Sequence, residues 1–190
     1  MNDRAALLAL VCDALASGDR DRAAAIVHDC YPFEATEKVQ RRYSERKMTE
    51  LFVRDGFIDR YRGTRLVFPP TLRLISDALP QYFPYHRNWK MSATHVAYWE
   101  LTPTVDHILP VALGGADDEA NWACCSMLTN GIKANWTLEQ LGWELLPAGE
   151  FAQWDGLLGW FVRQMEERPE YVEKSAYYRC WYTAARPHAV

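Results

Sequence analysis

Apolar side chains recur at helical spacing over several stretches of this chain, and this periodicity predicts most of its elements. In residues 152–167, Trp154, Leu158, Phe161 and Met165 fall three or four positions apart, as on one face of a helix. The same reasoning predicts further helices over residues 3–16, 19–30, 38–53 and 71–79. The chain is therefore expected to be mainly helical.

The first two predicted helices are separated by the sequence SGD, and Asp19 is a suitable N-cap for the second. Their faces are rich in Ala and Leu, which predicts an amphipathic helical hairpin. In the helix predicted over 38–53, the apolar side carries Val39, Leu51 and Phe52.

Alternating polarity and β-type residues predict strands elsewhere. The segment FIDRYRGTRLVFPP, residues 57–70, indicates a hairpin that ends at its two prolines. Residues 95–105 are predicted to form a strand, with Pro103 at a bulge or an edge position. NWACCS and LGWELL are two further candidate strands, and Ser126 can cap a helix that starts directly after the first of them.

These elements predict an α+β fold in which a mainly helical chain surrounds a small core of strands. The organisation expected from the sequence has four segments. They are an N-terminal helical hairpin (1–36), a basic helix and hairpin (37–94), a strand–loop–strand–helix segment (95–150) and a C-terminal helical segment (151–190).

Composition narrows the class of protein. The 190 residues are 49% hydrophobic and 24% charged, as is ordinary for a soluble globular chain. No segment approaches the roughly 18 apolar residues that cross a bilayer, so a cytoplasmic protein without membrane contact is expected. The five cysteines include no C-x-x-C pair, which argues against a disulfide framework and predicts buried reduced thiols.

Charge is distributed unevenly along the chain. Residues 38–90 carry 12 basic and 5 acidic side chains, a net charge of +7, while residues 1–37 have a net charge of −4 and residues 91–190 of −7. A basic middle segment could face a phosphate backbone, although such a run is often only a solvated surface. The candidate backbone contacts are Arg41, Arg42, Arg46, Lys47, Arg60, Arg62 and Arg65.

Candidate chemistry is concentrated after the strand predicted over 95–105. Asp106 and His107 stand together at its end, a Gly-Gly loop follows, and then come Asn121, Asn130 and Lys133. This pattern, V-D-H-I-x-P followed by G-G and by the two asparagines and the lysine at these spacings, resembles the HNH endonucleases. The resemblance implies a ββα-metal nuclease core within 95–150 and the hydrolysis of DNA phosphodiesters, in restriction, phage defence or phage DNA processing.

The residue types fit that chemistry. The Asp106 carboxylate and the Asn130 amide oxygen are hard ligands that suit Mg²⁺ or Mn²⁺. His107 could take a proton from water near neutral pH. Asn121 is expected to brace the loop that holds His107, and Lys133, one helical turn after Asn130, to contact a phosphate.

The sequence departs from the family in two respects. Asn130 stands where the last histidine of the family name would be, a variant that resembles the HNH domains of CRISPR effector nucleases. Many members also bind a structural zinc through two C-x-x-C pairs. Here Ser126 and Thr129 occupy the positions of the second pair, and no upstream pair exists. We therefore expect no structural zinc and a motif held by packing.

Several alternatives remain open on sequence alone. His107 and Asp106 could be structural residues at a strand end, and Asn130-Gly131 could be a helix C-cap. The chain could bind nucleic acid without cutting it, with RNA open as a substrate beside DNA. Its acidic helical ends, 1–36 and 151–190, could instead form a homodimer surface.

Overall fold

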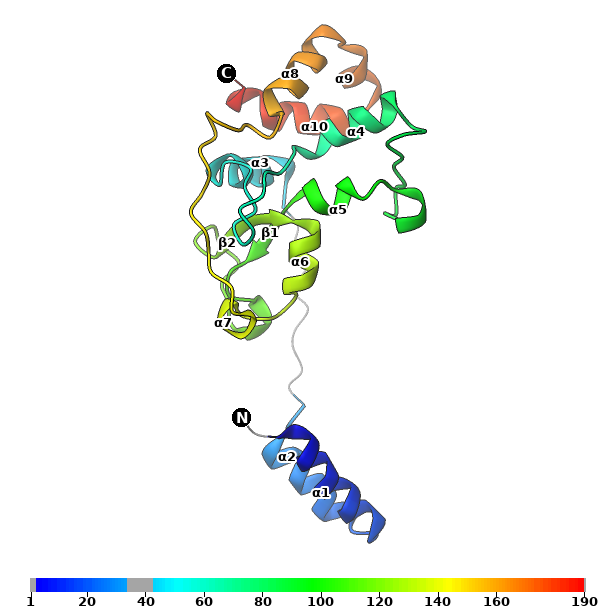
Figure 1. Cartoon of the computed structure of the whole chain (residues 1–190), viewed down its shortest axis with the longest axis vertical. Helices are drawn as coiled ribbons and strands as arrows, with labels where there is room; N and C mark the ends of the chain where they lie inside the picture. Colours follow the sequence, from blue (N-terminus) through cyan, green and yellow to red (C-terminus); the bar gives the residue numbers. More distant parts are fainter. Residues whose placement is uncertain (1–2, 34–42, 190) are drawn as a thin grey trace. The chain divides into compact units, whose positions relative to one another are not determined.

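The computed structural model describes residues 3–33 and 43–189, and the chain divides into two compact units, Met1–Gln40 and Arg41–Val190. In the first unit, α1 (Arg4–Ala16) and α2 (Arg20–Cys30) form a hairpin (Figure 1). The Asp19 side chain accepts a hydrogen bond from Arg22 N at 3.0 Å, which confirms the predicted N-cap.

The hairpin is not the amphipathic pair that was predicted, because α1 has no single apolar face. Only Ala14 in α1 and Ala23 in α2 are buried, whereas Leu8, Leu10 and Leu15 are 46–52% exposed. Apolar residues therefore surround α1 and do not form one stripe, because leucines and alanines occupy positions on all of its sides.

The second unit begins with α3 (Glu45–Arg54), which starts later than the helix predicted over 38–53. The Ser44 hydroxyl accepts a hydrogen bond from Lys47 N at 3.3 Å and so caps the helix there. Val39, Arg41 and Arg42 lie outside the described residues. Leu51 and Phe52 are buried in the main core, as their spacing predicted.

The predicted hairpin over residues 57–70 is present only as one isolated antiparallel bridge, between Ile58 and Arg65. Its two prolines do not simply end it. They open α4 (Pro69–Ala78), where proline suits the first turn of a helix because the missing N–H has no partner there.

The strand predicted over 95–105 is wrong in its first half, which forms α5 (Ala97–Leu101), and right in its second, which belongs to β1 (Pro103–His107). The reason is tertiary. Tyr98 is only 3% exposed and packs in a cluster with Phe83, Tyr85 and Trp89. A 3₁₀ turn, η1 (Met91–Ala93), precedes it.

β1 pairs with β2 (Trp122–Ser126) in an antiparallel sheet of two strands. Every residue of β2 is buried, since Trp122 and Cys124 belong to the main core and Ala123 and Cys125 to a second cluster around Tyr61. Residues 55–60 lie along the edge of β2 that does not pair with β1 (Figure 1).

Two buried carboxylates complete that edge. Asp55 Oδ2 accepts a hydrogen bond from Cys124 N at 2.8 Å, and Asp59 Oδ2 accepts one from Ser126 N at 3.0 Å. Arg60 N donates to Cys124 O at 2.8 Å. This segment therefore occupies hydrogen-bonding positions that a third strand would otherwise use.

The predicted helix after β2 is α6 (Met127–Lys133), capped by the Ser126 side chain. It continues through Asn130 and Gly131 to Lys133, and its C-cap is Ala134, so the alternative of an Asn-Gly C-cap is wrong. The strand predicted from LGWELL is also wrong. That stretch begins at the end of α7 (Leu138–Leu141), which Gly142 terminates with a φ of +64°.

The remaining chain runs beside the Asp55–Phe68 segment, with Leu146 N donating to Arg60 O and Gly149 N to Asp55 O. A Cβ at Gly56 would collide with the Gly149 backbone, so glycine permits this close approach. The helix predicted over 152–167 is α8 (Leu158–Glu167), which starts later. The Asp155 carboxylate accepts hydrogen bonds from Leu157 N and Gly159 N at its start.

The last helices are α8 (Leu158–Glu167), α9 (Glu170–Lys174), α10 (Ala176–Ala185) and the 3₁₀ turn η3 (Arg186–His188). They lie with α4 at one end of this unit (Figure 1), around a core that contains Phe57, Phe68 and Phe161. The fold is thus α+β, with a small sheet in a mainly helical chain, and packing supports its one strand pair.

The expectation of buried thiols holds for Cys124 and Cys125 and is wrong for Cys12, Cys30 and Cys180, which are exposed. Within residues 3–33 and 43–189, no helix has both the length and the apolar content to cross a bilayer.

Candidate functional site

The candidate site lies where β1 ends, at Asp106 and His107. The pairing sets Asp106 opposite Ala123 and His107 opposite Trp122. The two residues are 6% and 5% exposed. Their contacts differ completely, as expected for neighbours in a strand, which point to opposite faces.

On the first face, Asp106 Oδ2 has two partners. It accepts a hydrogen bond from the Tyr61 hydroxyl at 2.7 Å and lies 2.9 Å from the Lys133 ammonium group. Burial, and then the negative charge of Asp106, raise the pKa of Tyr61, so the phenol stays a neutral donor. Tyr61 was not among the predicted site residues, because it lies 45 positions before Asp106 in an unrelated segment.

Lys133 occupies a different place from the one predicted. Its side chain is fully buried, and Nζ donates to the carbonyl of His107 at 2.7 Å as well as pairing with Asp106. The ammonium group thus joins both residues of the strand end from within the core. The predicted phosphate contact has no counterpart in these contacts, since a buried ammonium is satisfied by its protein partners.

On the second face, His107 meets a carboxylate that the sequence did not suggest. His107 Nε2 lies 2.8 Å from Asp117 Oδ1, and the same oxygen accepts hydrogen bonds from the Tyr43 hydroxyl at 2.7 Å and from Trp122 Nε1 at 3.0 Å. Burial tends to raise the pKa of Asp117, but its hydrogen bonds to Tyr43, His107 and Trp122 outweigh this and lower it. Asp117 is therefore ionised at neutral pH.

Asn121 lies at the base of the loop between the strands and spans it. Its Oδ1 accepts from Leu109 N at 2.9 Å, and its Nδ2 donates to Leu109 O at 2.9 Å and to Ala116 O at 2.8 Å. Gly115 fits beneath it, because a Cβ there would collide with the Leu109 carbonyl. These are contacts of a residue that holds the loop, as distinct from one that reacts.

Asn130 faces β1 from α6. Its Nδ2 donates to Thr104 Oγ1 at 3.0 Å and to Val105 O at 3.3 Å, an arrangement that defines which amide atom is the oxygen. Asn130 on α6 therefore contacts β1, the strand that carries Asp106. Its amide nitrogen makes both of these hydrogen bonds, and its amide oxygen makes neither.

The two predicted metal ligands each keep one oxygen available. Among the described residues, Thr102 Oγ1 is the only buried side-chain nitrogen or oxygen without a hydrogen-bond partner. Asp106 Oδ1 and Asn130 Oδ1 accept no hydrogen bond in that part of the chain, so both must reach solvent. A carboxylate and an amide oxygen are ligand types that suit Mg²⁺ or Mn²⁺.

One feature opposes that fit. Lys133 neutralises Asp106, which lowers the attraction of the pair for a divalent cation. In residues 3–33 and 43–189 no group of three or more His, Cys, Asp and Glu side chains is placed to hold a metal. A cation at Asp106 and Asn130 would therefore need water and substrate phosphate oxygens as its other ligands.

Ser126 and Thr129, the positions expected from the sequence to replace zinc-binding cysteines, hydrogen-bond to one another and to the backbone. Ser126 Oγ donates to Thr129 Oγ1 at 2.9 Å and accepts from Thr129 N at 3.0 Å, so the pair caps α6. Burial raises the pKa of both neighbouring thiols, Cys124 and Cys125, well above the ordinary value, which keeps them protonated.

The basic residues proposed for nucleic-acid contact do not form one exposed group in the described part of the chain. Arg46 is exposed and paired with Glu50, and Lys47 is exposed near the ring of Trp122. Arg60 is instead mostly buried, donating to Asp55 and to Leu146 O.

The two remaining arginines with described positions lie over aromatic rings. The Arg62 guanidinium is 4.5 Å from the Trp143 ring centroid, and that of Arg65 is 5.2 Å from the Trp154 centroid. Both are exposed and stay available to a phosphate. Of the predicted phosphate contacts with described positions, Arg60 is the one that the structure contradicts, because its guanidinium pairs with buried Asp55 and with Leu146 O.

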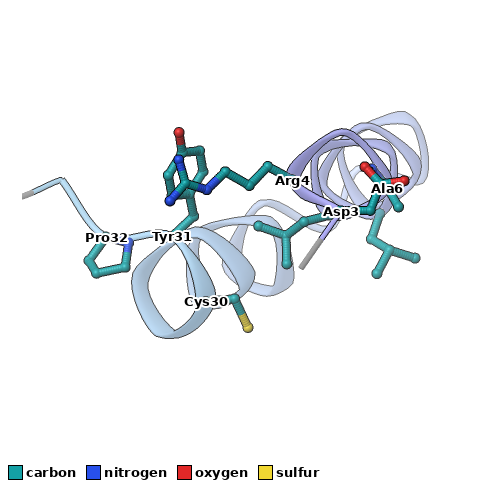
Figure 2. A pocket seen from close by; sticks show the side chains of 8 residues that line it. Asp3, Arg4, Ala6, Cys30, Tyr31 and Pro32 are labelled. Carbon is teal, nitrogen blue, oxygen red and sulfur yellow. The ribbon is translucent and has the colours of Figure 1, made fainter. Parts of the chain in front are cut away.

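A cavity of about 610 Å³ lies in the N-terminal hairpin, apart from these groups (Figure 2). The guanidinium of Arg4 lies 4.8 Å from the Tyr31 ring centroid beside it. Asp3 is the N-cap of α1, and its carboxylate accepts hydrogen bonds from Ala5 N and Ala6 N. None of the predicted site residues lines this cavity.

No family model, no curated protein and no solved structure matches this chain.

Proposed function

We propose that this protein is a metal-dependent endonuclease of the HNH type that hydrolyses DNA phosphodiester bonds. The observation that carries the proposal is the order β1, loop, β2, α6, with Asp106 and His107 at the end of β1 and Asn130 on α6 facing that strand. The proposal uses four residues, Asp106, His107, Asn121 and Asn130. Because Asp106 and His107 point to opposite faces of β1, they can act on one phosphate only beyond the end of that strand.

Each residue has a distinct task in this proposal. His107 takes a proton from water, whose oxygen then attacks the phosphorus while the bond to the 3′ oxygen breaks. Asp106 Oδ1 and Asn130 Oδ1 would hold one Mg²⁺ or Mn²⁺, which supplies charge stabilisation at the phosphate and at the leaving oxygen. Asn121 holds the loop next to the site, and Lys133 holds the strand end through Asp106 and the His107 carbonyl.

A plasmid-nicking assay tests the proposal. Wild type should nick supercoiled DNA with Mg²⁺ or Mn²⁺ and lose the activity in EDTA, and His107→Ala should lose it in all conditions. His95→Ala is a matched control, since His95 stacks on Phe83 at a ring-centroid distance of 4.3 Å and has no role in the proposed site. Equal cutting by wild type and His107→Ala would refute the assignment.

The second candidate function is binding of nucleic acid without cleavage. The ion pair between Lys133 and Asp106 favours it, because a neutralised carboxylate binds a divalent cation weakly. Calorimetric titration with Mn²⁺ separates the two. Binding that Asp106→Asn abolishes supports the nuclease, whereas retardation of DNA in a gel without metal binding supports the second candidate.

A further inference from the structure

Residues 86–94 form a compact loop between α4 and α5 (Figure 1). His86 N donates a hydrogen bond to Thr94 Oγ1 at 3.1 Å, which joins the two ends of this loop. Inside it, Trp89 N donates to the carbonyl of His86 at 2.8 Å, and the 3₁₀ turn η1 forms the second half. Surface loops whose ends meet and whose own groups hold them together are frequently functional.

Trp89 attaches the 86–94 loop to the core. Its ring packs edge-on against the rings of Tyr98 and Trp99 in α5, with centroids 5.5 and 5.6 Å apart. Trp89 has a φ of +49°, which a bulky residue rarely adopts and which persists only where the surrounding packing holds it. The loop is therefore held in one shape, and the residues on either side of Trp89 extend from a fixed backbone.

Two exposed basic residues, Arg87 and Lys90, lie on either side of Trp89 in this loop. Within residues 3–33 and 43–189, neither forms an ion pair or lies over an aromatic ring. Each of the other basic residues with described positions in the basic segment 38–90 does one or the other. Those paired with carboxylates are Arg46, Arg54, Arg60 and Arg73, and those over rings are Lys47, Arg62 and Arg65.

The chain around the 86–94 loop carries no opposing charge. Residues 78–99 contain neither Asp nor Glu, and no other stretch of the sequence without an acidic residue is as long. Two fixed positive charges apart from acidic side chains attract an anion, and a phosphate backbone offers anions in a row. Arginine and lysine are among the main donors to phosphate oxygens in complexes with DNA.

The 86–94 loop is attached to the same framework as the proposed active site. α5 follows the loop and leads into β1, the strand that ends at Asp106 and His107. α5 also contacts α6 and β2, and Trp89 packs on α5. A ligand that extends well beyond the strand end, as a DNA duplex does, can therefore meet both places on one rigid support.

We propose that the 86–94 loop is a contact surface for the phosphate backbone of DNA, with Arg87 and Lys90 each neutralising one phosphate. The choice of DNA as the ligand rests on the proposed function. Such contacts add affinity and fix the position of the duplex, and they read no sequence.

Binding of the full chain to a labelled DNA duplex of about 20 base pairs tests the proposal, by fluorescence anisotropy in EDTA at several salt concentrations. Each phosphate contact contributes about 0.9 to the slope of log affinity against log salt. Arg87→Ala with Lys90→Ala should bind more weakly and have a slope lower by about 2. Its affinity should therefore fall about tenfold less than that of wild type between about 50 and about 200 mM salt.

Two further double variants are the controls. Arg168→Ala with Lys174→Ala removes the same charge from two exposed positions in the glutamate-rich stretch 166–174, and it should keep the wild-type slope. Arg87→Lys with Lys90→Arg keeps both charges of the 86–94 loop, and it should keep the wild-type slope as well.

The outcomes separate this proposal from the nuclease. An unchanged slope in Arg87→Ala with Lys90→Ala, an equal loss in either control, or a wild-type protein that does not bind the duplex overturns the contact surface. Binding that depends on Arg87 and Lys90 in a protein that nicks no plasmid supports the surface and refutes the nuclease. Nicking that depends on His107, together with an unchanged slope, supports the nuclease and refutes the surface.

Discussion

At the end of β1, two neighbouring ionisable residues point to opposite faces and meet different surroundings. Asp106 lies among buried groups, since Tyr61 is 7% exposed and Lys133 fully buried. His107 meets Asp117, whose side chain is 34% exposed and belongs to a loop. The first face joins parts of the core, whereas the second connects the core to a surface loop.

The contacts of Asp106 stabilise the fold, whereas the contact with Asp117 orients the His107 ring. A charge inside the core needs its counter-charge, because an unpaired buried ion is costly. A carboxylate that water reaches can be lost at small cost to folding, yet it still determines how a neighbouring ring is oriented. Substitutions on the Asp106 face should therefore change the free energy of unfolding, and those on the His107 face mainly the chemistry.

The largest effect is expected from Lys133→Met, which keeps the apolar stem but leaves Asp106 without its cation. Removal of one partner of a buried ion pair typically costs about 3–5 kcal/mol. Urea denaturation measures the loss in the free energy of unfolding. The double variant Asp106→Asn with Lys133→Met should recover part of it, and a single variant within about 1 kcal/mol of wild type would show that the pair contributes little.

A smaller loss is expected from Tyr61→Phe, because the phenol donates a hydrogen bond to the buried Asp106 carboxylate. Leaving such an acceptor short of a donor costs about 1–3 kcal/mol, measured by the same denaturation. Tyr82→Phe is the control, since Tyr82 is 79% exposed and should unfold as wild type does. Equal midpoints for all three proteins would contradict the importance of the Tyr61 hydroxyl.

Asn121→Ala should change both the stability of the protein and its nicking activity, because Asn121 holds the loop between β1 and β2. It removes three hydrogen bonds at a half-buried position, for an expected cost of about 1 kcal/mol. Since the loop carries Asp117, nicking should fall by more than the stability loss explains. Asn135→Ala, at an exposed position, should change neither quantity. A variant that loses stability but keeps full activity would separate the loop from the site.

The smallest effect concerns pH. The pKa of Asp117 is lowered in the folded protein from an ordinary value of 3.8, so its contribution to stability is present above that value. It is lost as pH falls through the lowered folded-state pKa. The small difference in thermal midpoint between wild type and Asp117→Asn should therefore exist at pH 7 and shrink below about pH 4. A difference that grows in acid would contradict the sign.

Local signals predicted some elements well. Ser126 and the apolar run before it predicted β2 and the start of α6, because capping and burial of a short strand depend on adjacent residues. Asp19 predicted the start of α2 for the same reason. Residues 97–101 were predicted as strand and form α5, since the packing of Tyr98 against residues 83–89 overrides their β propensity.

The candidate site shows the same division. The resemblance to the HNH endonucleases singled out Asp106, His107, Asn121 and Asn130, and the fold brings β1, β2 and α6, which carry or flank them, together. No pattern could indicate Tyr61, which reaches Asp106 from 45 positions away, or distinguish Asp117 from the acidic residues that follow it.

The sequence by itself therefore determined the helical character of the chain, the strand–loop–strand–helix order and the residue types at the strand end. These depend on periodicity, on caps and on short spacing, which act between near neighbours. Only the tertiary structure decided that Lys133 turns inward to Asp106 and that Asp117 meets His107. Both contacts join side chains whose positions depend on how separate segments pack, and the burial that makes them matter exists only in the folded chain.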